Sequence, residues 1–431
     1  MTVKEVITSP RTGDSIIRIR HKSGLVIYVC EMPGFSSVEA MFAAKYGSVN
    51  TMFRKNGESD FTSVPEGIAH FLEHKLFENE DCQVFDLYAK TGASGNAYTS
   101  FDRTCYYFTC TKNYTDSLKI LLDFVQKPFF TKENVDKEIG IIEQEIKMSS
   151  DNPDWRVSSN MLRCMFHNHP VRIDIAGTAE SIKMINADLL YKCYDTFYNL
   201  NNMVLSVAGN VSADEIISIC DMCLKPCRNN GLETVFPDEP DNIVSPEIYE
   251  KLPVGTDFFQ MGFKCSPCSG MERLKKTMAG AVAVSILTDA STDMFKRLLS
   301  EGLINFTFGP EVFNGDGFFT VIFSGESSQP RKIREAILGE IERIRINGID
   351  LNIFQRSKKT GYGALVRELN NVDAVANLML NAHLEGISPF DKLNVLSELS
   401  PDDVYNFICS ELRSDRIVLS VIEKDGVNNE L

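Results

Sequence analysis

An acidic, proline-rich stretch near the middle of the chain limits the folds that are open to it. Prolines at 237, 240 and 246 and several acidic residues interrupt the segment Asn229 to Pro253, which has no helical period. Such composition is typical of a linker. Because 431 residues suit two domains of roughly 200 residues better than one core, we predict domains at residues 1–230 and 253–431, joined by a linker at 231–252.

Apolar periodicity predicts a similar order of elements in both halves. The first half is expected to contain a hairpin at Ser15–Cys30, strands at Val38–Tyr46 and Met203–Ala208, and two successive strands within Asn96–Cys110. Its helices are expected at Ile68–Phe77, Tyr114–Val125, Lys132–Met148 and Ser181–Phe197. The second is expected to contain strands at Phe258–Phe263, Phe318–Ser324 and Ile417–Ile422, and helices at Leu274–Leu287, Arg331–Asn347 and Ile353–Leu369. This pattern predicts an α+β fold of two similar domains, each a mostly antiparallel sheet with helices packed on one face.

Charge and composition limit the binding partners and the cellular compartment that we expect for this protein. A formal net charge of -15 would repel nucleic acid. No apolar run reaches 18 residues and no signal peptide opens the sequence, so no membrane partner is expected and the protein is predicted to be cytoplasmic. Twelve scattered cysteines are then best interpreted as reduced thiols.

The motif His70-Phe71-Leu72-Glu73-His74 falls within the predicted helix Ile68–Phe77. Residues four apart lie on one face of a helix, so both imidazoles can be directed at a common point, as two zinc ligands require. The carboxylate of Glu73 would lie beside the metal and could act as a general base. This is the reverse of HExxH, the inverted order of one group of zinc peptidases. Such a string can also arise by chance in a helix with solvated histidines.

A catalytic zinc site normally has three protein ligands, so the third must come from elsewhere in the chain. Glu138 and Glu145 are seven residues apart on the predicted helix Lys132–Met148 and therefore share a face, whereas Glu143 points elsewhere. We predict Glu145 as the third ligand and Glu138 as an auxiliary carboxylate. Taken alone, three glutamates on one helix are usually a solvated helix face.

Several motifs in one order resemble the pitrilysin/insulinase superfamily of zinc peptidases, which includes the mitochondrial processing peptidases. After Gly67 to His74, the similar segments are Asn96 to Ser100, Glu138 to Glu145, Asp151 to Pro153, His169 to Thr178 and Asn202 to Asn210. The resemblance implies one Zn²⁺ per chain, held by His70, His74 and Glu145, with Glu73 as the base.

The resemblance also implies how a peptide substrate binds. Asn96 and Ala97 would lie on an edge strand to which an extended peptide adds through main-chain hydrogen bonds, although a plain core-facing strand is the alternative. The family's second domain often supplies an Arg and a Tyr, for which Arg356 and Tyr362 are candidates. Their spacing of six departs from the expected seven, so both could be surface residues.

The length of the chain bears on its assembly. It is half as long as the single-chain insulinase-type members, so the resemblance implies a homodimer, or a heterodimer with a related subunit, that encloses short or unfolded peptides. The alternative function is a non-catalytic or weakly active subunit of a heterodimeric peptidase, which only binds and positions substrate. The presence of all four motif residues favours the active peptidase.

Two Cys-x-x-Cys pairs could in principle hold a structural metal. They are Cys220 with Cys223 and Cys265 with Cys268. The first pair falls in an amphipathic stretch that is typical of a helix, and the predicted linker separates it from the second pair. We therefore interpret all four as reduced structural thiols.

Overall fold

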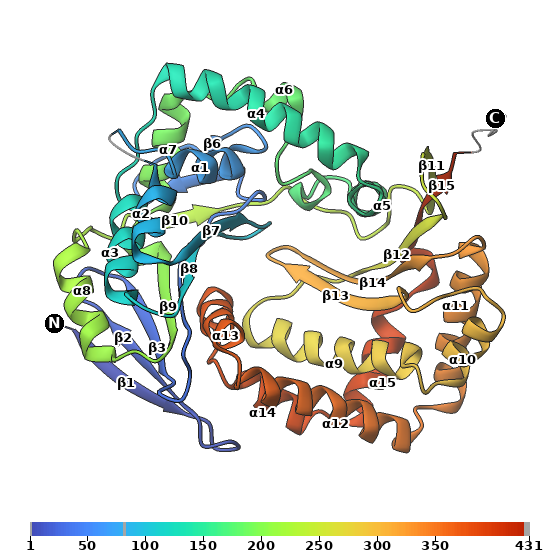
Figure 1. The fold of residues 1–431 in the computed structure, drawn as a ribbon. Helices are drawn as coiled ribbons and strands as arrows, with labels where there is room; N and C mark the ends of the chain where they lie inside the picture. Colours follow the sequence, from blue (N-terminus) through green and yellow to red (C-terminus); the bar gives the residue numbers. More distant parts are fainter. Residues whose placement is uncertain (1, 81–82, 426–431) are drawn as a thin grey trace. The chain divides into compact units, whose positions relative to one another are not determined.

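The computed structural model describes residues 2–80 and 83–425, which divide into two compact units (Figure 1). The first contains the described parts of Met1–Ile146, Asp174–Phe236 and Val366–Asp391. The second contains the described parts of Lys147–Ile173, Pro237–Leu365 and Lys392–Leu431. Each half of the sequence thus contributes one segment to the unit that the other half mainly builds.

The first unit is built on a seven-stranded sheet. Its strands lie in the order β1 (Val3–Thr8), β2 (Ser15–Arg20), β3 (Val26–Glu31), β9 (Met203–Gly209), β4 (Val38–Ala44), β8 (Thr104–Cys110) and β7 (Ser94–Thr99). All neighbours pair antiparallel except β3 with β9. A small second sheet has the order β10 (Leu232–Thr234), β5 (Met52–Lys55) and β6 (Thr62–Ser63). Strands β1 and β7 are the two edges of the large sheet.

Helices from the first half of the chain cover one face of this sheet (Figure 1). Phe42 of β4 and Leu205 of β9 lie opposite each other and pack with buried apolar residues from these helices, such as Phe71 and Leu122. Hydrophobic burial on this face dominates the stability of the unit. The helical elements are α1 (Ile68–Leu76), α2 (Val84–Thr91), α3 (Tyr114–Val125), α4 (Lys132–Asp151), α6 (Ala179–Ile182), α7 (Ala187–Phe197), η2 (Leu200–Asn202) and α8 (Ala213–Cys223).

A single helix from the second half of the chain packs on the other face. This helix, α13 (Val372–Glu385), contacts β9, β4 and β3. Ser206 of β9, next to Leu205 and therefore on the opposite face, is fully buried and donates a hydrogen bond of 2.7 Å to the carbonyl oxygen of Ala376. The two sheet faces are thus covered by different halves of the sequence.

The second unit contains a five-stranded sheet with the order β11 (Glu247–Leu252), β15 (Ile417–Lys424), β12 (Phe258–Cys265), β14 (Phe318–Glu326) and β13 (Gly309–Gly315). Phe407 of α15 packs on one face, 6.2 Å from the ring of Phe319. Helix α5, from the first half of the chain, packs on the other face, where the missing side chain of Gly262 leaves room for Met161 and Met165. The helical elements are α5 (Pro153–Met165), η1 (Pro170–Arg172), α9 (Gly270–Thr288), α10 (Asp293–Ser300), α11 (Pro330–Asn347), α12 (Leu351–Glu368), α14 (Asp391–Glu398), α15 (Pro401–Glu411) and η3 (Ser414–Arg416).

The two large sheets share one strand pattern. In chain order, β3, β4, β7, β8 and β9 of the first unit correspond to β11, β12, β13, β14 and β15 of the second. Both sets have one parallel pair, β3 with β9 and β11 with β15, followed by three antiparallel pairs. The prediction of two similar, mostly antiparallel α+β units is confirmed. In the structure, one further helix covers the second face of each sheet. Helix α5, from the first half of the chain, packs in the second unit, and α13, from the second half, packs in the first unit.

Two features of the predicted organisation need correction. The stretch expected to be a linker at 231–252 contains two strands, β10 and β11, which pair with β5 and β15. The helix expected at Ser181–Phe197 is broken, because Asn186 caps a new helix by accepting the amide hydrogen of Leu189 at 3.0 Å. The predicted boundaries at 230 and 253 stay a prediction, and each compact unit combines segments from both halves of the chain. Among the described residues, no helix combines the length and the hydropathy that spanning a bilayer demands.

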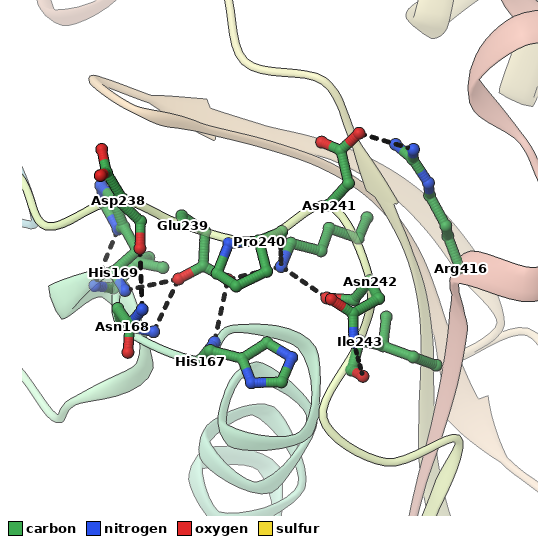
Figure 2. Close-up of polar contacts among 12 residues, drawn as sticks. His167, Asn168, His169, Asp238, Glu239, Pro240, Asp241, Asn242, Ile243 and Arg416 are labelled. Carbon is green, nitrogen blue, oxygen red and sulfur yellow. Dashed lines mark hydrogen bonds and ion pairs between the residues drawn. The ribbon is translucent and has the colours of Figure 1, made fainter.

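Part of the predicted linker is anchored firmly within the second unit (Figure 2). The Glu239 carboxylate accepts hydrogen bonds from the backbone amides of His167, Asn168 and His169 at 2.6–2.9 Å. Its fourth partner is the Lys264 ammonium at 2.5 Å, which also donates to the carbonyl oxygens of Pro240 and Asn242. These partners favour the ionised carboxylate and outweigh the opposing effect of burial, so the pKa of Glu239 is lowered to about 2.

The replacement Glu239→Gln is therefore expected to lower the melting temperature at neutral pH. A carboxyl group whose folded pKa lies below its unfolded value stabilises the fold above pH 4.5, and this stabilisation is lost as the pH falls towards 2. The difference in melting temperature should be constant from pH 7 to about 5 and should shrink in more acidic buffer. The control is Asp241→Asn, which removes an exposed partner of Arg416 and should change stability little. A constant difference down to pH 3 would contradict this account.

Candidate metal centre

Helix α1 begins where the chain passes close to another segment of the same unit. Gly67, the residue before α1, has φ 86°, and a Cβ placed on it would lie 2.4 Å from the carbonyl oxygen of Ala176. Only glycine adopts this left-handed conformation at no steric cost and also leaves room for that contact. The carbonyl oxygen of Glu66 accepts a hydrogen bond from Ser181 Oγ at 2.9 Å. The start of α1, and with it the position of His70 one turn later, is fixed in this way.

The three predicted ligands lie together in the first unit. Nε2 of His70 and Nε2 of His74 are each 3.5 Å from a carboxylate oxygen of Glu145, on α4. One ligand atom from each residue lies within 4.8 Å of the others. The residues described by the structure contain no second cluster of this kind. The structure thus brings the three candidate ligands together in space, and their binding of a metal stays a prediction.

This cluster has the donors that zinc prefers. Two imidazole nitrogens and one carboxylate oxygen make a typical ligand set for a catalytic zinc, which keeps a further position open. The side chains of His74 and Glu145 are 25 % and 42 % exposed, so solvent can reach the cluster. Burial, together with the neighbouring His74, lowers the pKa of His70 to about 3, so its imidazole is neutral and has a lone pair available for a metal. The residues present fit a Zn²⁺ ion.

The general-base candidate is held by the edge strand. Glu73 is buried on α1 and its Oε2 accepts a hydrogen bond from Thr99 Oγ1 of β7 at 2.7 Å. Burial raises the pKa of Glu73 above the usual glutamate value, and this hydrogen bond opposes the rise. A carboxylate with a raised pKa is better suited to accept and return a proton near neutral pH. The role of Thr99 was not predicted, although the residue falls in the segment Asn96 to Ser100.

Glu138 orients the second histidine. Its Oε1 lies 3.0 Å from His74 Nδ1 and its side chain is only 7 % exposed. Although burial opposes ionisation, His74 and Lys75 lower the pKa of Glu138, so the carboxylate is the acceptor and Nδ1 carries the proton. His74 Nε2 is then free for the metal, which is the usual arrangement around zinc-bound histidines. Glu143 faces elsewhere, as predicted, and pairs with Lys183 at 2.7 Å.

The strand β7 presents its free edge at Ala97. On its other side β7 pairs with β8, and Asn96 and Ala97 lie opposite Tyr107 and Tyr106. The amide of Ala97 donates to the side-chain oxygen of its exposed neighbour Asn96 at 2.9 Å, and not to β8. An incoming peptide strand would take over this amide once the Asn96 side chain moved aside.

The remaining candidates are carried by other elements of the chain. Arg356 is exposed and Tyr362 is half-buried, both on α12 in the second unit. Cys220 and Cys223 lie on α8, whereas Cys265 ends β12. All cysteines in the described part of the chain are free thiols.

Comparison with known proteins gives the family. Residues 62–179 match the model of insulinase, peptidase family M16, and residues 184–360 match that of the peptidase M16 inactive domain. The uncharacterized zinc protease YmfH of Bacillus subtilis is 37% identical over 95% of this chain and 97% of its own length. An uncharacterized zinc protease of Rickettsia bellii is 28% identical over 75% of this chain and 76% of its own.

A solved structure agrees with these relatives. The crystal structure of an M16-like peptidase from Alicyclobacillus acidocaldarius is 33% identical, covers 98% of both chains and superimposes with a TM-score of 0.91. The matches to the family models and to YmfH together span most of the sequence, including the metal-site motif. The chain therefore belongs to peptidase family M16, the insulinase family, whose relatives named here are zinc proteases.

Proposed function

We propose that this chain is a zinc metalloendopeptidase that hydrolyses short or unfolded peptides, with one Zn²⁺ per chain and Glu73 as general base. The observation that carries the proposal is the convergence of His70, His74 and Glu145 beside Glu73. Its zinc-protease relatives support the same reaction class.

The residues of the chain divide the chemical work between them. His70, His74 and Glu145 would hold the zinc, which when bound supplies Lewis acidity towards the scissile carbonyl. Glu73, held by Thr99, takes a proton from the attacking water and returns it to the departing amine. The free edge of β7 at Asn96 and Ala97 aligns the peptide main chain and leaves side-chain selection loose. No covalent intermediate with the protein is needed.

The proposal includes an assembly. Two chains, either identical or related, are proposed to enclose the substrate in a chamber in the cytoplasm, with Arg356 and Tyr362 as candidate substrate contacts. The second candidate function, a non-catalytic subunit, is favoured only by the match of residues 184–360 to the M16 inactive domain. The four site residues lie outside that match, which favours the active peptidase.

Removal and return of the metal test this function. A chelator is expected to abolish cleavage of an unstructured peptide while the protein stays folded by circular dichroism, and stoichiometric Zn²⁺ should restore it. A large folded protein should resist cleavage that its denatured form undergoes. Full activity of the metal-free chain would refute the zinc mechanism. A folded chain that binds zinc but cleaves no peptide, alone or with a second copy, would favour the non-catalytic subunit.

A further inference from the structure

A fully buried lysine lies next to the metal centre. Lys75 follows His74 on α1 and has no exposed side-chain surface. Its ammonium pairs with Glu78, two residues after the end of α1, and lies 3.5 Å from Oε2 of Glu138 on α4. An ammonium group is costly to bury unless carboxylates surround it, so these contacts decide where the group lies.

The Glu138 carboxylate joins this lysine to the metal site. One of its oxygens, Oε1, accepts from His74 Nδ1 at 3.0 Å, and the other, Oε2, faces the Lys75 ammonium. Each oxygen thus has its own partner, so the carboxylate cannot turn without losing one of them.

We propose that Lys75 is a positioning residue of the metal centre, which acts through Glu138 to hold the His74 imidazole in its metal-binding orientation. The inference rests on the proposed zinc site and deepens it. Without the ammonium, Glu138 would be free to rotate, or to reach the metal itself, and the His74 ring would lose its fixed partner. Outer partners of this kind commonly change metal affinity by roughly 10–100-fold.

A purely structural role for Lys75 makes a different prediction. The ion pair with Glu78 could serve only to stabilise α1. In that case the loss of Lys75 and the loss of Glu138 would affect zinc binding independently. If Lys75 acts through Glu138, the effects of the two losses on zinc affinity must be non-additive. Once Glu138 is lost, Lys75 has no means of acting on His74, so its loss has no further effect.

The experiment compares zinc dissociation constants, measured by competition with a chromogenic chelator, for the full-length wild type and its variants. Lys75→Met is expected to weaken zinc binding about tenfold. Lys75→Met combined with Glu138→Gln should bind no more weakly than Glu138→Gln alone, within about twofold. Lys75→Arg keeps the cation and should stay near wild type. Lys119→Met, which removes an exposed lysine on α3 paired with Asp116, is the matched control and should not change zinc binding.

A second measurement separates positioning from folding. The visible spectrum of the Co²⁺-substituted protein is expected to change in Lys75→Met and not in Lys75→Arg, because it reports the ligand geometry. Unchanged zinc affinity in Lys75→Met, or additive losses in the double variant, would overturn the proposal. Should Lys75→Met fail to fold, Lys75→Gln serves in its place with the same expectations. A wild-type chain that binds zinc but cleaves no peptide would overturn the proposed function and leave the role of Lys75 standing. The zinc-affinity and Co²⁺ measurements do not depend on peptide cleavage.

Discussion

Replacing Glu73 by glutamine is expected to abolish peptide cleavage while zinc remains bound. The amide keeps the size of the side chain and can still accept the hydrogen bond from Thr99, but it cannot take a proton from water. General-base catalysis commonly contributes about 10²–10⁴-fold to a rate, so kcat should fall by at least two orders of magnitude. Zinc content, measured on the same preparation, should remain near one ion per chain.

The stability of this variant provides an internal control. Burial raises the pKa of Glu73 in the folded chain, so the ionised form is disfavoured by the fold above the unfolded value of 4.5. The neutral glutamine relieves this cost, and the variant should melt no lower than wild type at pH 7. Loss of activity then cannot be assigned to unfolding. A variant that retains wild-type turnover with full zinc content would exclude Glu73 as the base.

Replacing Glu145 by glutamine should have the largest effect on metal binding. Its carboxylate faces both histidines at 3.5 Å, and removal of its charge leaves two neutral imidazoles to hold a divalent cation. The loss of zinc affinity should exceed the 10–100-fold that is typical of residues outside the ligand set. Cleavage should fall in parallel and return partly at high zinc concentration.

Helix α4 supplies a matched control for this experiment. Glu143 lies two residues earlier on the same helix and pairs with Lys183 instead of facing the histidines. Glu143→Gln makes the same chemical change and should leave zinc affinity and cleavage unaltered. Equal zinc affinity in the Glu143 and Glu145 variants would mean that Glu145 is not a ligand.

Much of the fold and of the metal cluster could be predicted from the sequence because the underlying signals are local. A helical spacing of four brings His70 to the same face as His74, and a spacing of seven does so for Glu138 and Glu145. Both spacings are helical in the structure, because α1 and α4 are continuous across these residues. The resemblance to the family then supported Glu145 as the carboxylate that completes the set.

What escaped prediction depends on contacts between distant segments. Nothing in the order of residues indicates that α13 covers the sheet at Ser206, because a helical period does not say which sheet the helix joins. Lys75 is three residues before Glu78, which by itself is typical of a solvated helix pair. The burial of Lys75 is evident only in the folded chain, where Glu138 of α4 lies beside it. The strands β10 and β11 were missed because prolines and acidic residues between them obscure two short runs.

The exchange of α5 and α13 has a consequence for any break in the chain between the halves. A protease that cuts at Phe236–Asp238 would produce two fragments, yet each would keep a helix packed within a unit that the other fragment mainly builds. The nicked protein should therefore hold together as a noncovalent complex. Conversely, a truncated chain that ends at residue 230 would lack α13. The sheet face around Ser206, which is buried in the full chain, would then be exposed. The two halves repeat one pattern of strands, but they are not independent modules.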